Sequence, residues 1–462
     1  MDLVQILNEE QYSAYNSILN FVENQEDHNI ITLTGFAGTG KSFLISHLCH
    51  KFVELGHSVC ISAPTNKACK VISNFINNGF PTLSNKVSVL TCARLLGLKA
   101  KYDPQLDREI FISDKDNWNQ LDKFSIVIID ECSMLSESLY NQFYNFFSNL
   151  GLICNKKLIF CGDLAQLPPV GEIQSLSFSE QFQKVNLQTI FRYSGPILHL
   201  SQKIREFQSQ NKIIPRFKED IFDNKGIFNY DEDTWFKYLC DYFKSHEYNY
   251  NKDFCRALAW TNKEVSNINK YVRKSLYGPK SLPYVPGELL IADSPCLDKP
   301  SISSASIILN TSEEFIIDSV SPFSFSNKLF PDKIWEGYLL NGYNESNLPI
   351  TLNAIHPSFL PDYKKCVDII RKKVQKNNFK KNLTPNYVQY YELSRLFHPI
   401  NYSYAITVHK SQGSTYNNVF INFCDIRKII KINNGSSESL KEMYKLLYVA
   451  ITRATSNVFF LQ

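Results

Sequence analysis

The chain has 462 residues, which is too long for one ordinary domain and predicts two to four. With 44% hydrophobic and only 20% charged residues, its composition excludes wholesale disorder. The formal net charge of +4 is compatible with a nucleic-acid partner but too small to indicate one by itself.

Signals of export or membrane insertion are missing from the sequence. No run approaches the roughly 18 apolar residues of a membrane span. The N-terminal segment MDLVQILNEEQ is acidic and lacks the basic start of a signal peptide. The 12 cysteines form no CxxC pair, so a zinc ribbon is not expected and a reducing compartment is favoured. We expect a soluble, cytoplasmic protein with no membrane partner.

Short apolar runs in the first third predict buried parallel strands, because they are rich in β-branched residues and do not alternate with polar ones. These runs span residues 30–33, 58–63, 126–129 and 157–161. Between the first two lies a helical pattern, FLISHLCHKFVELG, with Gly56 as its expected C-cap. This strand–helix–strand order predicts a doubly wound α/β domain.

The segment GFAGTGKS, residues 35–42, follows the first strand and opens the helix, as a phosphate-binding loop does. Backbone N–H groups of Gly38, Thr39 and Gly40 are expected to surround phosphate oxygens at the positive end of the helix dipole. Lys41 is expected to reach the β and γ phosphates of ATP, and the Ser42 hydroxyl is expected to bind Mg²⁺.

Two acidic residues end the strand in IVIIDECSM, residues 126–134. Open α/β sheets bind ligands at the carboxyl ends of their strands, so this position favours a catalytic role. We expect Asp130 to hold Mg²⁺ and Glu131 to orient and deprotonate the attacking water. A pair of acids in an ordinary turn is the alternative. The presence of the phosphate loop in the same chain favours the catalytic interpretation.

Three further residues are candidates for contact with the γ-phosphate. Gln166 in FCGDLAQLPPV has an amide that can accept from the water and donate to phosphate. Arg192 in LQTIFR and Arg453 in LLYVAITRA can stabilise the charge that develops on the equatorial oxygens. A surface ion pair is the alternative for Arg192.

The later part of the chain predicts a second α/β pattern with an insertion. Strands are expected at 255–260, 404–409, 418–423 and 457–461, with a helix at 261–276. Between about 287 and 399 the pattern becomes short and alternating, which predicts a β-rich insertion. Residues 364–381 contain eight basic residues and one acid, Asp368. A solvated helix face and a nucleic-acid contact explain this stretch equally well.

Taken together, these segments resemble the superfamily 1 helicases, in the branch of the Dda-type phage helicases and the RecD-like enzymes. The resemblance covers nearly the whole chain in the family's order. It rests on NEEQYSAYN, GFAGTGKS, SAPTNKACKVI, TCARLLGL, IIDECSM, GDLAQLPPV, LQTIFR, ALAWTNKEVSNIN, VPGELLIA, YAITVHKSQGSTYNNVFI and LLYVAITRA. The blocks VHKSQGST and YVAITRA are the most specific, since they are not expected together in an unrelated phosphate-loop enzyme.

The resemblance implies two RecA-like parallel-sheet domains with ATP and Mg²⁺ between them and an SH3-like insertion in the second. It places the first domain at 1–190, the second at 191–286 and 400–462, and the insertion at 287–399. Arg192 and Arg453 would reach ATP from the second domain's side. Gln11 would read adenine, and Gln412 and Gly413 would couple the nucleotide to DNA.

The family's activity implies an ATP-dependent 5′→3′ helicase acting on single-stranded and forked DNA in replication, recombination or repair. The polarity comes from the resemblance alone. A working monomer is expected in the nucleoid or in the cytoplasm of a phage-infected host, with replication or recombination proteins as possible partners.

Hydroxyl, amide and imidazole side chains near strand ends are the candidate DNA contacts, because such groups and helix N-termini bind phosphate. They are Thr65, Asn66, Thr91, Thr407 and His409. A plain helix N-cap is the alternative for Thr91, and simple packing is the alternative for His409. In the region 99–120, where relatives carry a strand-separating pin, the pattern shows no clear hairpin. Tyr102, Phe111 and Trp118 are candidates for base stacking there, with core packing as the alternative.

Three alternatives stay open. The chain could be an RNA helicase or triphosphatase of superfamily 1, because the ATP residues would be the same. It could be an ATP-dependent loading module on single-stranded DNA that does not unwind, although Glu131, Gln166 and Arg453 argue against slow hydrolysis. It could also be a subunit of a nuclease complex; the short segment before the first motif favours the stand-alone form.

Overall fold

The structure is a computed structural model. It describes residues 6–24, 28–103, 108–113, 118–150, 156–169, 171–210, 217–223, 225–298, 306–376, 385–432 and 436–462, without the side chains at 99–111, 375–376, 385–387 and 432. The chain divides into two compact units. One contains Met1–Lys101, Phe111–Val265 and Ile406–Gln462, and the other contains Tyr102–Ile110 and Ser266–Ala405. The predicted domain boundaries remain predictions.

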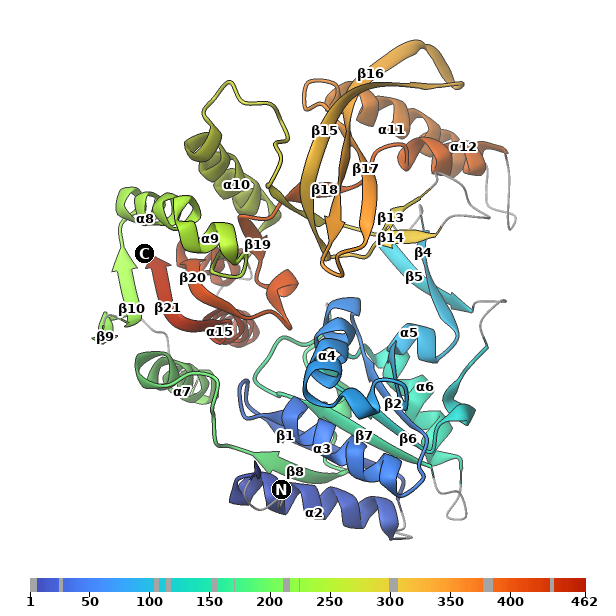
Figure 1. The fold of residues 1–462 in the computed structure, drawn as a ribbon, viewed down its shortest axis with the longest axis vertical. Coiled ribbons are helices and arrows are strands. Elements are labelled where there is room, and N and C mark those ends of the chain that lie inside the picture. The colour runs from blue at the N-terminus through green and yellow to red at the C-terminus, as the bar shows by residue number, and fades with distance from the viewer. Residues whose placement is uncertain are drawn as a thin grey trace. The chain divides into compact units, whose positions relative to one another are not determined.

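A six-stranded sheet lies in the first half of the chain, and its strands are all parallel (Figure 1). In sheet order its strands are β3 (Val87–Thr91), β2 (Val59–Ala63), β6 (Ile126–Ile129), β7 (Lys157–Gly162), β1 (Ile30–Gly35) and β8 (Gln183–Leu187). The predicted doubly wound α/β domain is therefore confirmed. The sequence pattern located four of these strands and missed β3 and β8.

Two hydrophobic cores cover the two faces of this sheet, because alternate residues of each strand point to opposite sides. Ile128 belongs to the core with α2, α3 and α4, whereas its neighbour Ile129 belongs to the core with α5 and α6. The helices are α2 (Glu9–Glu23), α3 (Lys41–Glu54), α4 (Asn66–Gly79), α5 (Cys92–Leu95) and α6 (Glu137–Ser148).

The end of α3 forms as the sequence predicts. Gly56 has a φ of 84°, and the backbone N–H of His57 donates to the carbonyl of Phe52 at 2.9 Å. This is the hydrogen-bond pattern of a glycine-terminated helix, in which the left-handed residue lets the chain turn back towards the next strand.

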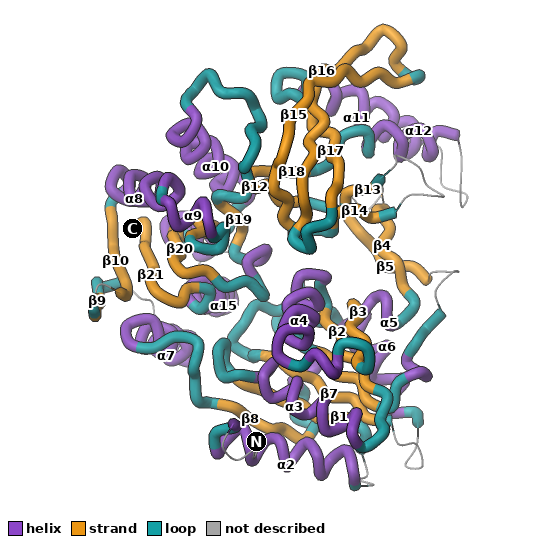
Figure 2. Tube along the Cα trace, viewed as in Figure 1, coloured by secondary structure: helices purple, strands orange, loops and turns teal. Residues whose placement is uncertain are grey.

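A second sheet carries the other parallel strands, and its helices are seen on both sides in Figure 2. In sheet order it contains β19 (Ala405–Thr407), β11 (Cys255–Ala259), β20 (Tyr416–Asn422), β21 (Ala454–Leu461), β10 (Lys225–Tyr230) and β9 (Asp220–Phe222). Strands β11, β20, β21 and β10 are parallel, and β9 is an antiparallel edge. Its helices are α7 (Gly195–Gln210), α8 (Glu232–Lys244), α9 (His246–Tyr250), α13 (Phe423–Ile426), α14 (Lys428–Ile432) and α15 (Ser437–Ile451), and β11 leads into α10 (Asn262–Tyr277).

The predicted β-rich insertion is a five-stranded antiparallel sheet, with two helices between its last two strands along the chain. In sheet order its strands are β17 (Pro349–Ile355), β16 (Phe330–Asn344), β15 (Glu314–Asn327), β12 (Leu289–Ala292) and β18 (Ile400–Tyr402). A separate pair is formed by β13 (Cys296–Leu297) and β14 (Ile307–Leu309), and the helices are α11 (Leu360–Lys376) and α12 (Pro385–Ser394). The resemblance to an SH3 fold stays a prediction.

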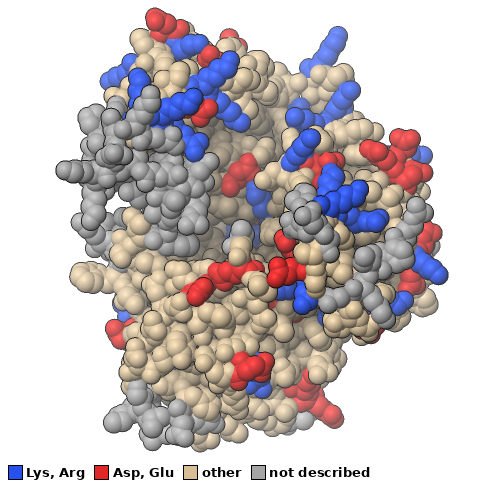
Figure 3. Space-filling model, turned by 180° about the vertical axis from the view of Figure 1, so that it is seen from behind, with Lys and Arg blue, Asp and Glu red and all other residues tan. Residues whose placement is uncertain are grey.

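Helix α11 carries most of the predicted basic stretch. Tyr363, Cys366, Ile370 and Val374 bury one face of it in a core that includes Trp335. Its exposed lysines are Lys364, Lys365, Lys372 and Lys373. Figure 3 shows Lys and Arg side chains gathered at the upper left, in the part of the chain that includes α11. Residues 377–381 lie outside the described residues. The described part is an amphipathic helix with an exposed basic face, which fits a solvated face and a nucleic-acid contact alike.

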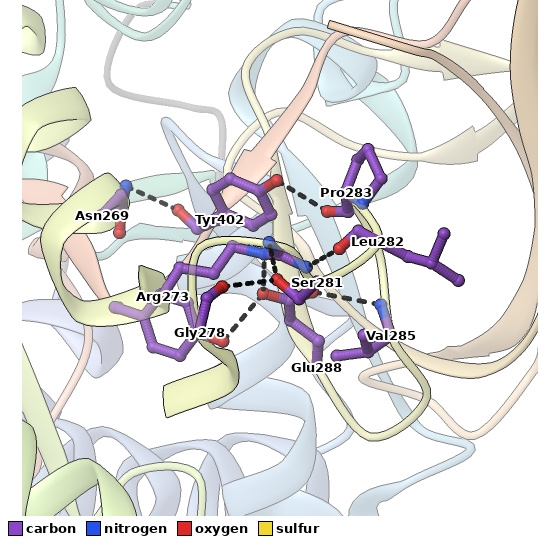
Figure 4. Close-up of polar contacts among 10 residues, drawn as sticks. Asn269, Arg273, Gly278, Ser281, Leu282, Pro283, Val285, Glu288 and Tyr402 are labelled. Atoms are coloured by element: carbon purple, nitrogen blue, oxygen red, sulfur yellow. Dashed lines mark hydrogen bonds and ion pairs between the residues drawn. The ribbon is translucent and has the colours of Figure 1, made fainter. Parts of the chain in front are cut away.

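A buried ion pair lies at the root of the insertion, between α10 and the loop that leads into β12 (Figure 4). Arg273 Nε donates to Glu288 Oε1 at 2.9 Å, and Nη1 donates to Ser281 Oγ at 3.1 Å. The hydroxyl of Tyr404 donates to the same carboxylate at 2.8 Å. Burial raises the pKa of Glu288, and the charge of Arg273 opposes that rise. The loop is therefore fixed to the helix by hydrogen bonds to charged groups.

Two short strands pair in a region where the sequence pattern shows no clear hairpin. The region 99–120 contains β4 (Leu98–Asp103) and β5 (Arg108–Ser113), which pair with each other. These strands are rich in charged residues and lack the Asn-Gly or Asp-Gly turn that marks a hairpin in sequence. The side chains of Tyr102 and Phe111 lie outside the described residues, and that of Trp118 is 84% exposed.

Short 3-10 turns connect several elements. They are η1 (Pro81–Leu83), η2 (Leu121–Lys123), η3 (Cys132–Met134), η4 (Leu176–Phe178) and η5 (His409–Ser411). The cysteines in the described residues are free thiols, and all but Cys424 are buried, as expected of small core residues. Over the described part of the chain, we find no helix with the length and apolar character that crossing a membrane requires.

Candidate active site

The phosphate loop joins β1 to α3, and its glycines are required by geometry. Gly38 and Gly40 have φ values of 85° and 79°, which only glycine adopts readily. A Cβ at Gly38 would lie 2.6 Å from Cβ of Arg192, and one at Gly40 would lie 2.5 Å from Nε2 of Gln11. The loop therefore has no room for a side chain at either position.

Lys41 is the first residue of α3 and lies against the loop. Its Nζ donates to the carbonyls of Gly35 at 2.8 Å and Phe36 at 3.1 Å. Buried Thr39 closes the loop on itself, since Oγ1 donates to the carbonyl of Phe36 at 2.9 Å. The ammonium is therefore held inside the curve of the loop, where phosphates would bind. The Thr39 hydroxyl, in contrast, stabilises the loop by its internal hydrogen bond.

The two expected magnesium ligands come together from different elements. Ser42 Oγ on α3 lies 3.5 Å from Oδ2 of Asp130, which follows β6. In the described residues no group of three His, Cys, Asp or Glu side chains gathers to hold a metal. One hydroxyl and one carboxylate fit Mg²⁺, because that ion usually takes few protein ligands and completes its shell with water and phosphate.

Glu131 is held in an unusual backbone conformation beside Asp130. Its φ of 51° is left-handed, a region that non-glycine residues enter rarely and often at functional sites. Its Oε2 is buried without a hydrogen-bond partner. Burial and the neighbouring charge of Asp130 raise the pKa of Glu131, and the positive charges of Lys41 and Arg453 oppose this rise. A buried acceptor without a partner suits a residue that binds a water during the reaction.

Two buried amides also have free polar atoms. Gln166 Oε1 and Gln412 Nε2 are buried without partners, one an acceptor and the other a donor. Gln412 ends the turn η5, and Gly413 after it has a φ of 78°. The hydrogen bonds of the described residues join neither amide to the phosphate loop. The free atoms fit a site that takes a polar ligand such as a nucleotide.

Arg453 is fully buried near the end of the chain. Its Nε donates to the carbonyl of Val449 at 3.1 Å, and Nη1 donates to that of Ser414 at 3.2 Å. Burial and the charge of Arg192 lower the pKa of Arg453, whereas the charge of Glu131 raises it. The guanidinium thus acts electrostatically on a carboxylate more than 300 residues earlier in the sequence.

Arg192 lies beside the phosphate loop with an exposed side chain. Its backbone N–H donates to the carbonyl of Gly38 at 3.3 Å, and that of Phe191 donates to the same carbonyl at 2.8 Å. The ion pairs of the described residues do not include Arg192. The surface ion pair proposed as the alternative is therefore not formed in the described part.

Gln11 also reaches the phosphate loop. Its backbone N–H donates to Oδ1 of Asn8 at 2.6 Å, which caps α2, and its side-chain Nε2 donates to the carbonyl of Thr39 at 3.1 Å. The cap fixes the start of the helix, and the amide then lies against the loop. A role in reading adenine stays a prediction.

Two family models match the chain. A model described as an AAA domain matches residues 20–172, and one described as a UvrD-like helicase C-terminal domain matches residues 402–461. The first match contains the phosphate loop and the paired carboxylates. The second contains Gln412, Gly413 and Arg453.

Relatives extend these matches. An uncharacterised protein of Acanthamoeba polyphaga mimivirus is 27% identical over 99% of this chain and 100% of its own length. The ATP-dependent DNA helicase Dda of Enterobacteria phage T4 is 23% identical over 63% of this chain and 61% of its own length. This chain belongs to superfamily 1B of the helicases.

The fold agrees with this membership. A solved structure of the Pif1 helicase from Bacteroides, in complex with ADP-AlF3 and single-stranded DNA, matches this helicase with a TM-score of 0.51 and 17% identity. The match covers 98% of this chain and 92% of that one. At this identity the similarity shows the fold.

The threonines predicted to contact DNA in the first α/β domain cap helices. Thr65 Oγ1 accepts from the N–H of Ala68 at 3.2 Å at the start of α4, and Thr91 Oγ1 accepts from that of Arg94 at 3.2 Å at the start of α5. Each hydroxyl keeps its own proton, so capping leaves it able to donate to a phosphate. Asn66 is exposed beside Thr65. The N-cap proposed as the alternative for Thr91 is therefore formed, and a DNA contact of its hydroxyl stays a prediction.

The candidates in the second α/β domain lie around η5. Thr407 Oγ1 accepts from the N–H of Lys410 at 3.3 Å, which again leaves its proton free. Burial lowers the pKa of His409, so its ring is neutral near neutral pH. A neutral imidazole donates one hydrogen bond but carries no charge to attract phosphate.

Sequence reasoning missed two residues at the centre of the helicase's site. Asp163 Oδ2 accepts from the N–H of Ala37 at 2.7 Å and from the hydroxyl of Tyr448 at 2.8 Å. Both lie in segments that were singled out, GDLAQLPPV and LLYVAITRA, but neither has a residue type that demands a role by itself. Only their meeting in space identifies them.

Proposed function

We propose that this helicase hydrolyses ATP with Mg²⁺, moves 5′→3′ along single-stranded DNA and opens forked duplexes. The observation that carries the proposal is the convergence of charges on Glu131. Lys41 of the phosphate loop and Arg453 of the C-terminal segment both act on this carboxylate. Hydrolysis that needs a residue from each sheet can be coupled to movement of one sheet relative to the other.

The residues divide the chemistry among them. Lys41 and the loop amides bind the phosphates, and Ser42 and Asp130 hold Mg²⁺, which would neutralise charge on the phosphate oxygens. Glu131 orients the attacking water and takes its proton, while Gln166 accepts from that water. Arg453 and Arg192 stabilise the charge of the transferring phosphoryl group. Gln412 and Gly413 relay the nucleotide state to the strand, and Gln11 reads adenine.

For the DNA path we propose Thr65, Asn66, Thr91, Thr407 and His409. Contacts of hydroxyl and amide groups with phosphates carry no sequence information, so we expect little base specificity. We further propose that the helicase works as a monomer in the cytoplasm and serves replication, recombination or repair.

Unwinding of two partial duplexes, one with a 5′ tail and one with a 3′ tail, tests this function. We expect ATP- and Mg²⁺-dependent opening of the 5′-tailed duplex alone. Opening of the 3′-tailed duplex alone would keep the helicase and overturn the polarity. Opening of neither, with strand-stimulated ATP hydrolysis intact, would favour the loading module or the nuclease subunit.

Two controls sharpen this experiment. Lys41→Met should open no duplex, because the phosphates lose their principal cation, and it should still bind oligo-dT. Comparison of poly-dT with poly-U as stimulators of ATP hydrolysis separates the DNA helicase from the RNA helicase alternative. Stronger stimulation by poly-U would favour the latter.

A further inference from the structure

A hydrogen-bonded triangle joins three segments that are far apart in the sequence. Tyr448 in α15 donates its hydroxyl proton to Oδ2 of Asp163, just after β7, at 2.8 Å. The N–H of Ala37 in the phosphate loop donates to that same oxygen at 2.7 Å and to the Tyr448 hydroxyl at 3.1 Å. All three residues are buried, at 3% exposure or less.

The triangle is strong because one corner is a buried carboxylate. Asp163 accepts a further hydrogen bond at Oδ1, from the N–H of Ala165 at 2.9 Å. Burial and the charge of Asp163 raise the pKa of Tyr448, so its hydroxyl keeps its proton and acts as the donor. Hydrogen bonds to a charged group are about twice as strong as neutral ones, more so away from water.

Tyr448 also lies on the structural path to Arg453. The next residue, Val449, offers the carbonyl that accepts from Arg453 Nε at 3.1 Å. Displacing the end of α15 would therefore displace the guanidinium that acts on Glu131. The ring of Tyr448 also lies near a second cation, Arg205 of α7. The guanidinium carbon of Arg205 is 5.8 Å from the ring centre of Tyr448 and 3.5 Å from that of Phe36.

We propose that Tyr448 is a positioning residue, whose hydrogen bonds to Asp163 and Ala37 set the place from which Arg453 acts on the ATP phosphates. This inference rests on the proposed function. It predicts that loss of the hydroxyl slows the chemical step more than it weakens ATP binding, because its hydrogen bonds among the described residues go to Asp163 and Ala37 and it acts through Arg453.

Tyr448→Phe tests the role, because it removes one oxygen and keeps the ring. In strand-stimulated ATP hydrolysis we expect kcat to fall by about tenfold, the effect of losing one hydrogen bond to a charged group, with little change in KM. Tyr416→Phe is the matched control. Its hydroxyl is buried without a partner on the neighbouring strand β20, so its loss should leave kcat unchanged.

A double-mutant cycle separates positioning from general structural support. In an Arg453→Lys background, Tyr448→Phe should cause little further loss of kcat, because the group that it positions is already altered. Asp163→Asn should cause the same loss of kcat in the native background, because it removes the charged acceptor of the Tyr448 hydroxyl. This second variant tests the proposal if Tyr448→Phe does not fold.

Wild-type kcat in Tyr448→Phe, or an equal further loss in the Arg453→Lys background, would overturn the proposal. Failure of the proposed function would appear differently, as a native protein without strand-stimulated ATP hydrolysis.

Discussion

At the scale of single residues, Glu131 shows how the fold prepares a group for chemistry. Its left-handed backbone is strained, and burial together with the adjacent charge of Asp130 disfavours the ionised form of its carboxylate. Such arrangements cost stability and persist where the rest of the structure enforces them, often at catalytic sites. Lys41 and Arg453 offset part of that cost.

Glu131→Gln is the corresponding prediction. The amide has nearly the same shape but cannot take a proton, so we expect kcat for ATP hydrolysis to fall by roughly 10²- to 10⁴-fold. Nucleotide binding, measured with a fluorescent ATP analogue, should be retained or strengthened, because a buried negative charge is removed. A wild-type rate would show that another group acts as the base.

At the scale of elements, the insertion is attached through a buried ion pair and a short loop. Glu288 is 1% exposed, and its carboxylate contacts Arg273, Tyr404 and the N–H of Val285. Burying a charge is tolerable only when it is paired and hydrogen-bonded. The pair thus joins the part of α10 from Ser266 onward to the loop before β12, and both belong to the same compact unit.

Arg273→Met should weaken this attachment by about 3–5 kcal/mol, because it leaves Glu288 buried without its cation. Hydrogen exchange of the β12 and β15 amides measures the loss as a smaller free energy of local opening. Lys333→Met is the control, since Lys333 pairs with Asp362 at 2.6 Å with both side chains about half exposed. Its effect should be much smaller. Equal effects of the two substitutions would contradict the role of the buried pair.

At the scale of the whole molecule, the residues proposed to bind the nucleotide and those proposed to bind the strand come from both parallel sheets. Lys41 and Thr65 follow strands of the first sheet, and Thr91 ends one. Thr407 ends a strand of the second sheet, and Gln412 and Arg453 lie in segments next to its strands in the chain. Two such sites are expected to be coupled. A ligand that stabilises one arrangement of the sheets raises or lowers the affinity for the second ligand, because the second site is built from the same two sheets.

We therefore expect a non-hydrolysable ATP analogue to change the affinity for oligo-dT by roughly 5- to 150-fold. Fluorescence anisotropy of labelled oligo-dT, titrated with and without the analogue, measures this factor. Gln412→Ala should bring the factor closer to one, because the buried Nε2 of Gln412 is free to sense the nucleotide. No change of affinity in the native protein would contradict coupling between the two sites.

The sequence by itself determined what depends on neighbouring residues. The phosphate loop, its flanking strand and helix, the paired acids after β6 and the glycine end of α3 are all local patterns, so their geometry follows from backbone preferences and burial. The two parallel sheets followed from runs of apolar residues, and the family from the order of the motifs.

Tertiary structure alone decided what depends on residues far apart. The β4–β5 pair has charged strands without a turn signature, so only its pairing reveals it. Ala37, Asp163 and Tyr448 are hydrogen-bonded to one another, although more than 400 residues separate Ala37 from Tyr448. No local backbone preference encodes these contacts. The influence of Arg453 on Glu131 arises in the same way, because Coulomb interactions depend on distance in space and on burial, and neither can be read from spacing along the chain.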